Sequence, residues 1–189
     1  MFKQIIVLVI VSLLAACGSG KTGKRSVNII VGDSIIAGWA TLPDEWQNYG
    51  VTGDRSQDVI NRLGDVILAQ PTTIIIAIGV NDIAVDAVLN RFDSPLFTNY
   101  PIILERLLKE TSAKIYIWSV LPTSDPKAAD FIIKANVELR DFARIYDVTY
   151  VDTYSAFPSV ADKPYFIDGT HPTPYGYTIL NKFLPAITP

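Results

Sequence analysis

The residues of this sequence best suited to nucleophilic chemistry are one serine and one histidine. Ser34 follows Gly32 and Asp33, and His171 is the only histidine among 189 residues. Asp168 stands three positions before His171, where its carboxylate could hold one imidazole nitrogen while the other faces a serine. If the fold brings Ser34 to this pair, the three residues could perform acyl transfer, with Ser34 as nucleophile, His171 as general base and Asp168 as the group that orients the base.

Acyl transfer also requires hydrogen-bond donors for the oxyanion of the tetrahedral intermediate. The candidates are the backbone N–H groups of Ser34 and Gly53 and the side-chain amide of Asn81. Ser34 is expected at a helix N-terminus, where the positive end of the helix dipole would further stabilise negative charge. Gly50 is an alternative to Gly53, because it lies only three residues earlier, at the end of the weak predicted strand 47–51.

Each of these residues also has a structural explanation. Asp33 or Ser34 could cap a helix, and a lone histidine in a loop could be a surface group. Gly53 and Asn81 could be ordinary turn residues. No single motif therefore decides between structure and catalysis, and the argument for catalysis depends on their joint occurrence.

The secondary-structure pattern places these residues at one edge of a sheet. Short apolar segments alternate with longer amphipathic ones, and the continuous aliphatic runs indicate strands covered by helices on both faces. We predict an α/β fold, a three-layer α/β/α sandwich around a mainly parallel, flavodoxin-like sheet, with motifs at the carboxyl ends of its strands. The predicted strands are 27–31, 47–51, 73–78, 114–120 and 148–152, and the predicted helices are 56–69, 96–111, 127–146 and 174–184.

Four short blocks, taken in chain order, resemble the SGNH (GDSL-type) esterase/lipase family. They are Gly-Asp-Ser at 32–34, a glycine at 53, Gly-x-Asn-Asp at 79–82 and Asp-x-x-His at 168–171, and the resemblance spans about residues 27–184. It implies the SGNH hydrolase fold and carboxylic ester hydrolysis through an acyl-enzyme, without a metal ion or organic cofactor. The implied catalytic residues are Ser34, Asp168 and His171, and the implied oxyanion donors are Ser34, Gly53 and Asn81.

The resemblance does not fix the substrate, because one triad serves lysophospholipases, thioesterases, arylesterases and acetyl-sugar esterases. We expect a hydrolase of the lysophospholipase, thioesterase or arylesterase kind in the cell envelope, with a small ester, a lipid or an acylated glycan as its substrate. A carbohydrate acetylesterase acting on envelope polysaccharide is one alternative, and a non-catalytic envelope binding module is a second. Segments 83–100 and 153–167 are expected to be loops that shape the pocket. Their aromatic side chains, with two tryptophans, could line an acyl groove or pack in the core: Phe92, Phe97, Tyr154, Phe157, Tyr165, Phe166, Trp39 and Trp46.

Composition limits the other possibilities. A length of 189 residues with 49% hydrophobic residues suits one domain with a sizeable core. The net charge of −3 is spread along the chain, so a nucleic-acid partner is not expected. The single cysteine allows neither a disulfide within the chain nor a thiolate metal cluster.

The N-terminal segment is typical of a bacterial lipoprotein. Residues 1–16 have the positive charge and short apolar run of a signal peptide, too short to span a bilayer. The sequence Leu14-Ala15-Ala16-Cys17 resembles a lipobox, which predicts lipidation of Cys17, a flexible tether over 17–25 and a hydrolase domain over 26–189. We therefore expect a membrane-anchored protein of the cell envelope, at the outer membrane facing the periplasm if the host is Gram-negative. An ordinary secretory signal or an uncleaved anchor is the alternative.

Overall fold

The computed structural model describes residues 26–157 and 164–186. The predicted signal peptide, Cys17 and the tether lie outside the described residues. The elements follow in the order β1 (Asn28–Gly32), α1 (Ser34–Ala37), β2 (Trp46–Gly50), α2 (Ser56–Leu68), β3 (Thr73–Ala77), α3 (Val80–Leu89), α4 (Pro95–Glu110), β4 (Lys114–Trp118), α5 (Ala129–Ile145), β5 (Thr149–Val151), the 3-10 turn η1 (Tyr154–Ala156), α6 (Pro174–Leu180) and the 3-10 turn η2 (Asn181–Phe183).

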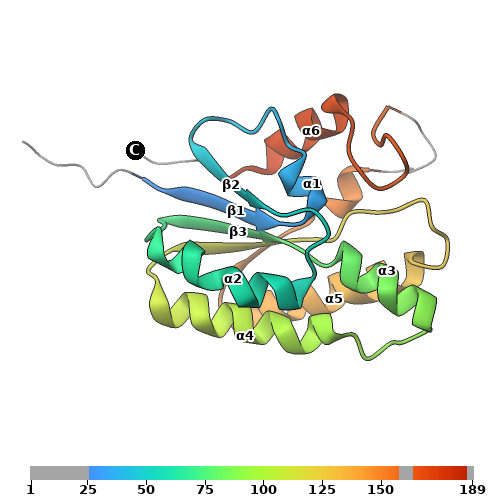
Figure 1. Cartoon of the computed structure of the whole chain (residues 1–189), viewed down its shortest axis with the longest axis horizontal. Helices are drawn as coiled ribbons and strands as arrows, with labels where there is room; N and C mark the ends of the chain where they lie inside the picture. The colour runs from blue at the N-terminus through green and yellow to red at the C-terminus, as the bar shows by residue number, and fades with distance from the viewer. Residues whose placement is uncertain (1–25, 158–163, 187–189) are drawn as a thin grey trace, which may run out of the picture.

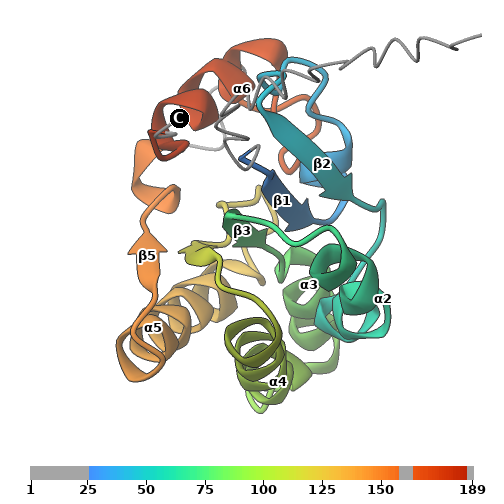
Figure 2. The same cartoon turned by 90° about the vertical axis from the view of Figure 1, so that its left-hand side faces the viewer.

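The strands form one parallel sheet with the order β2-β1-β3-β4-β5. Helices α1 and α6 cover one face, and α2, α3, α4 and α5 lie on the other (Figures 1 and 2). Every residue of β1 is buried, as its continuous apolar run predicted for a central strand. The predicted five-stranded α/β/α fold is therefore confirmed, and the strand ends that carry the motifs gather on the right of Figure 1.

Helix α3 was not predicted, and α1 is the helix that was expected to begin at Ser34 but was given no bounds. Helix α1 is a single turn of four residues, too short to show a hydrophobic period. Helix α3 occupies much of the segment 83–100 that was predicted as a loop, so that prediction is wrong. Val80, Ile83 and Ala87 supply the buried, helix-spaced side chains of α3, but the polar residues of the Gly-x-Asn-Asp block obscure this pattern in the sequence. Asn90, in the left-handed conformation with a φ of 49°, ends the helix.

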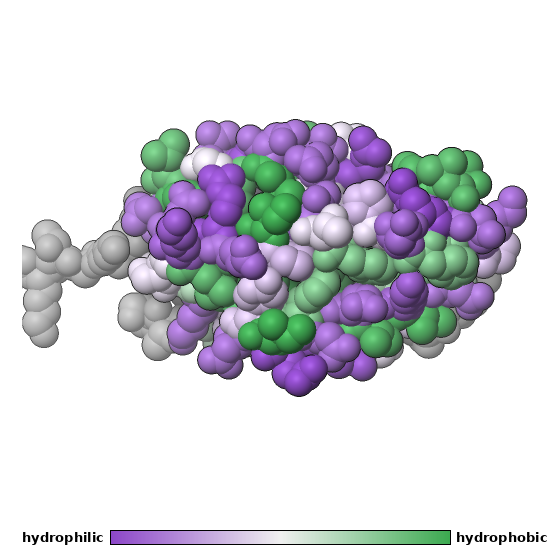
Figure 3. Space-filling view, turned by 90° about the horizontal axis from the view of Figure 1, so that it is seen from below, coloured by the Kyte–Doolittle hydropathy of each residue, from purple (hydrophilic) through white to green (hydrophobic). Residues whose placement is uncertain are grey.

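The outer surface of the helical layer is mainly hydrophilic. Apolar side chains form separate groups among polar ones when the molecule is viewed from below (Figure 3). Within the described part of the chain, no helix has the length and apolar character needed to cross a bilayer.

Candidate active site

Ser34 is presented by the sharp turn between β1 and α1. Asp33 precedes it and caps the helix, because its Oδ1 atom accepts a hydrogen bond of 2.9 Å from the backbone N–H of Ile35. Gly32 is required for packing, since a Cβ atom there would collide with Ile36 and with the carbonyl oxygen of Ala77. The Asp33 cap is therefore real, as the structural explanation expected, and it holds Ser34 at the strand end.

His171 reaches Ser34 from the other end of the sequence. The Oγ atom of Ser34 lies 2.9 Å from Nε2 of His171, and Nδ1 of His171 lies 2.7 Å from Oδ2 of Asp168. This is the order that a nucleophile, a base and an orienting carboxylate require. The structure thus brings together the three residues predicted to be catalytic.

The loop that carries Asp168 and His171 is stabilised by its own backbone. Oδ1 of Asp168 accepts hydrogen bonds from the backbone N–H groups of Thr170 at 3.0 Å and His171 at 2.9 Å. The backbone N–H and the imidazole of His171 lower the pKa of Asp168 to about 2. Gly169 has a φ of 84°, and a Cβ atom there would collide with Ser124. The two oxygens of Asp168 therefore have separate tasks, one in folding the loop and one in holding the imidazole.

The second predicted donor lies in a tight turn after β2. The N–H of Asp54 donates to the carbonyl oxygen of Val51 at 3.2 Å, and Gly53 has a φ of 85° at the third turn position, as a type II turn requires. No heavy atom lies within 4 Å of a Cβ atom built on Gly53, so its backbone is open to a ligand. Gly50 is different, because its N–H donates to the side chain of Asn48 and its Cα packs against α1. The geometry favours Gly53 over Gly50.

Asn81 lies in the first turn of α3 and is anchored to the Gly53 turn. Its Nδ2 atom donates to the carbonyl oxygen of Asp54 at 2.9 Å, which leaves the second N–H of the amide for another acceptor. The neighbouring Asp82 is buried and accepts from the backbone N–H and the hydroxyl of Ser56 at 2.9 and 2.6 Å. Asp82 therefore ties the start of α3 to the start of α2.

The backbone N–H groups of Ser34 and Gly53 donate to no acceptor among the described residues, so both are free for an oxyanion. The helix dipole contributes little at Ser34, contrary to the prediction. Because α1 has only four residues, few aligned peptide dipoles contribute, and local N–H groups must supply the stabilisation.

This geometry agrees with comparisons to known proteins. The family model of the GDSL-like lipase/acylhydrolase family matches residues 30–179. The chain belongs to the GDSL-like lipase/acylhydrolase family. No curated protein matches the sequence. The membership supports a carboxylic ester hydrolase, so the alternative of a non-catalytic binding module is set aside.

Solved structures resemble the chain over most of its length. A GDSL-like lipase from Bacteroides thetaiotaomicron superposes with a TM-score of 0.74 at 26% identity, covering 85% of this chain and 86% of that one. A catalytic mutant of an acetylxylan esterase from Geobacillus stearothermophilus gives a TM-score of 0.68 at 18% identity, covering 83% and 91%. The second comparison shows a shared fold only.

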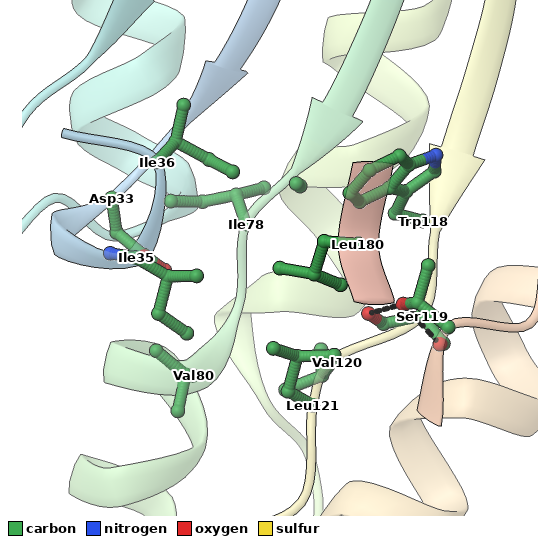
Figure 4. Close-up of a pocket in the computed structure, with 12 residues that line it drawn as sticks. Asp33, Ile35, Ile36, Ile78, Val80, Trp118, Ser119, Val120, Leu121 and Leu180 are labelled. Carbon is green, nitrogen blue, oxygen red and sulfur yellow. Dashed lines mark hydrogen bonds between the residues drawn. The ribbon is translucent and has the colours of Figure 1, made fainter. Parts of the chain in front are cut away.

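In this GDSL-like hydrolase the carboxyl group beside the nucleophile is unusually sheltered. Asp33 is 2% exposed, and Figure 4 shows it among apolar side chains of α1, the end of β3 and the start of α3. A small cavity of about 20 Å³ adjoins it, lined mainly by apolar residues. Burial raises the pKa of Asp33 to about 7, although the N–H of Ile35 and the nearby His171 oppose this.

Asn81 and His171 face a common pocket of about 330 Å³. The polar part of its wall includes Thr123, Asp125 and Thr170, and the apolar part comes mainly from α3 and α5. None of the eight aromatic residues considered for an acyl groove lines this pocket among the described residues. Four of them are buried in the core instead: Trp39, Trp46, Phe157 and Phe166.

Sequence reasoning missed residues that hold the motifs in place. Gly169 is one, although a glycine beside Asp168 in a loop was a visible signal for a turn with positive φ. Tyr177 of α6 is another, since its hydroxyl donates to the carbonyl oxygen of Ile35 at 2.7 Å and links the histidine side of the site to α1. Arg62 is a third, and no sequence pattern distinguished it from the other charged residues of α2.

Proposed function

We propose that this chain hydrolyses carboxylic esters with Ser34 as nucleophile, His171 as general base and acid, and Asp168 as the group that orients His171. The observation that carries the proposal is the continuous hydrogen-bond chain from Ser34 Oγ through the imidazole to Asp168, with lengths of 2.9 and 2.7 Å.

In the first half of the reaction, Ser34 Oγ attacks the ester carbonyl carbon and its proton passes to Nε2 of His171. The carbonyl oxygen becomes an oxyanion and accepts hydrogen bonds from the N–H groups of Ser34 and Gly53 and from the Asn81 amide. The carbon–oxygen bond to the alcohol then breaks. His171 returns the proton to the leaving oxygen, and Ser34 retains the acyl group as an ester.

In the second half, a water molecule replaces the alcohol. His171 takes one proton from this water as its oxygen attacks the acyl carbon, and the same donors bind the second oxyanion. The bond to Ser34 Oγ breaks, His171 returns the proton to that oxygen, and the carboxylic acid leaves.

The pocket beside His171 and Asn81, whose lining includes neither Ser34 nor Gly53, favours a small, uncharged substrate group that carries hydroxyls. Its volume of about 330 Å³ is at the lower end for ligand pockets. The hydroxyls of Thr123 and Thr170 can bond to sugar hydroxyls, and the carboxylates of Asp125 and Asp168 would repel an anionic headgroup. These features support the carbohydrate acetylesterase over a lysophospholipase or an acyl-CoA thioesterase, and the fold shared with an acetylxylan esterase is consistent with it.

A substrate panel tests this choice. We expect p-nitrophenyl acetate and acetylated xylo-oligosaccharides to give higher kcat/KM values than p-nitrophenyl octanoate or a lysophospholipid. Asp125→Asn should raise kcat/KM severalfold for the anionic ester p-nitrophenyl hemisuccinate and leave the acetate ester unchanged. Asp65→Asn on the exposed side of α2 is the matched control. Faster turnover of octanoate or lysophospholipid would instead assign a lipid substrate.

We also propose that the protein is anchored in the cell envelope by a lipid on Cys17. The lipobox-like sequence 14–17 ahead of the predicted tether supports this location. Cells fed radiolabelled palmitate should label the wild type in the membrane fraction, and Cys17→Ala should remove both the label and the membrane association. Equal labelling of both proteins would exclude Cys17 as the lipidated residue.

A further inference from the structure

Arg62 in α2 connects two of the four motif segments. Its Nε atom donates to Oδ2 of Asp54 at 2.6 Å, and its Nη2 atom donates to the carbonyl oxygen of Gly32 at 3.0 Å. Asp54 directly follows Gly53, and Gly32 lies two residues before Ser34. The planar guanidinium group of Arg62 thus bridges the turn that carries Gly53 and the strand end that presents Ser34.

The carbonyl oxygen of Gly32 is a shared acceptor in this arrangement. It also accepts a hydrogen bond of 3.0 Å from the backbone N–H of Val51, the first residue of the Gly53 turn. Arg62 and Val51 therefore fix the two ends of the turn to the same atom, one through the side chain of Asp54 and one directly. The direction of the Gly53 N–H relative to Ser34 depends on both connections.

The network extends to the third donor. The backbone carbonyl of Asp54 accepts from the Asn81 amide at 2.9 Å, so a shift of Asp54 would also move the support of Asn81. The side chains of Arg62 and Asp54 are 20% and 11% exposed, and solvent screens their charges only partly. An arginine suits this site because its rigid fork can serve two acceptors at once, which the single ammonium of lysine does less well.

We propose that Arg62 is a positioning residue for ester hydrolysis, which sets the oxyanion donors Gly53 and Asn81 at their working distance from Ser34. Arg62 does not touch the substrate in this account. It acts through Asp54 and Gly32, so its loss should weaken binding of the transition state while leaving binding of the ground state nearly unchanged. The proposal rests on the esterase function described above.

The test compares three variants of the full-length chain in detergent micelles with p-nitrophenyl acetate. Arg62→Met keeps a long side chain and removes both hydrogen bonds. We expect kcat to fall roughly ten- to hundredfold, because small misplacements of catalytic groups cost about this much. KM should change less than about threefold. Arg62→Lys should restore part of kcat. Arg144→Met is the matched control, since Arg144 is 77% exposed, pairs with Asp141 on α5 and should keep wild-type kcat.

Two further readouts separate positioning from general stability. Affinity for a phenylboronic acid, which forms a tetrahedral adduct with the serine, should fall in Arg62→Met in parallel with kcat/KM. The double variant Arg62→Met/Asn81→Ala should lose less activity than the product of the two single losses, because both act on the same oxyanion site. Circular dichroism and the Tm establish that each variant is folded.

Different results would refute the esterase function and the role of Arg62. If the wild type shows no ester hydrolysis that Ser34→Ala abolishes, the esterase function is refuted. An active wild type with a folded Arg62→Met variant that keeps kcat and boronate affinity within about twofold would refute the role of Arg62. If Arg62→Met does not fold, Arg62→Lys decides, because wild-type kcat and boronate affinity in this variant would contradict the need for a two-acceptor bridge.

Discussion

His171 and Ser34 are 137 residues apart in the sequence, and their Nε2 and Oγ atoms lie 2.9 Å apart in the fold. The contact joins the loop before α6 to the turn after β1. Tyr177 reinforces it, since its hydroxyl donates to the carbonyl oxygen of Ile35 at 2.7 Å.

Asn81→Ala should lower kcat about a hundred- to a thousandfold, the usual cost of removing one oxyanion donor. The variant retains the Asp82 contacts that tie α3 to α2, so it should remain folded. Steady-state kinetics with p-nitrophenyl acetate measures the effect. Unchanged kcat in a folded variant would exclude Asn81 from the oxyanion site.

Esterase activity should fall in acid because His171 gains one proton. His171 must be neutral to accept the proton of Ser34, so protonation of its imidazole in acid removes the base. Asp168 does not contribute a second proton there, because its hydrogen bonds from His171 lower its pKa to about 2. Because the buried Asp33 beside Ser34 has a pKa raised to about 7 and ionises in the same range, the plot of log kcat/KM between pH 4 and 8 is recorded in Asp33→Asn, where the acid limb should have a slope of one. A flat acid limb would argue against His171 as the base.

Asp33→Asn should be more stable than the wild type at alkaline pH. The folded pKa of Asp33 is raised from 3.8 to about 7, so folding favours its protonated form and the wild type loses stability as the pH rises through that range. The introduced carboxamide cannot ionise, and its oxygen can still accept from the N–H of Ile35. Between pH 4 and pH 8, the unfolding free energy of Asp33→Asn minus that of the wild type should increase by at most about 4 kcal/mol, at 1.36 kcal/mol per pH unit. Urea unfolding at both pH values measures it, and an unchanged difference would show that Asp33 ionises freely.

Gly169→Ala should reduce kcat at least about tenfold. The substitution places a Cβ atom at a φ of 84° and against Ser124, so the loop that holds Asp168 and His171 must move. Gly64→Ala in α2 is the control, because a Cβ atom there meets nothing within 4 Å. It should keep full activity and gain up to about 1 kcal/mol from helix propensity. Equal kcat in the two variants would show that the loop tolerates the change.

The sequence predicted the sheet well because its central strands are continuous aliphatic runs, a pattern that few other structures produce. It predicted Ser34, Gly53 and Asn81 at one edge for the same reason, since parallel strands place their carboxyl ends together, whereas Asp168 and His171 reach that edge through the loop before α6. The chemistry-bearing residues were visible because each stands in a short motif, which follows a strand end for Ser34, Gly53 and Asn81 and lies in the loop before α6 for Asp168 and His171.

The remaining features depend on contacts that the sequence does not encode locally. Helix α3 was missed because its apolar spacing overlaps the polar Gly-x-Asn-Asp block. The aromatic residues could not be assigned to pocket or core without knowing which face of the loops is covered. Arg62 could not be recognised because its partners, Asp54 and Gly32, lie 8 and 30 residues away.

The most direct test of the account is the loss of Ser34. The full chain and its Ser34→Ala variant would be treated with a fluorophosphonate probe and assayed with p-nitrophenyl acetate. We expect the wild type to be labelled by the probe and to hydrolyse the ester, and we expect the folded Ser34→Ala variant to do neither. Labelling or turnover that persists without Ser34 would contradict this account.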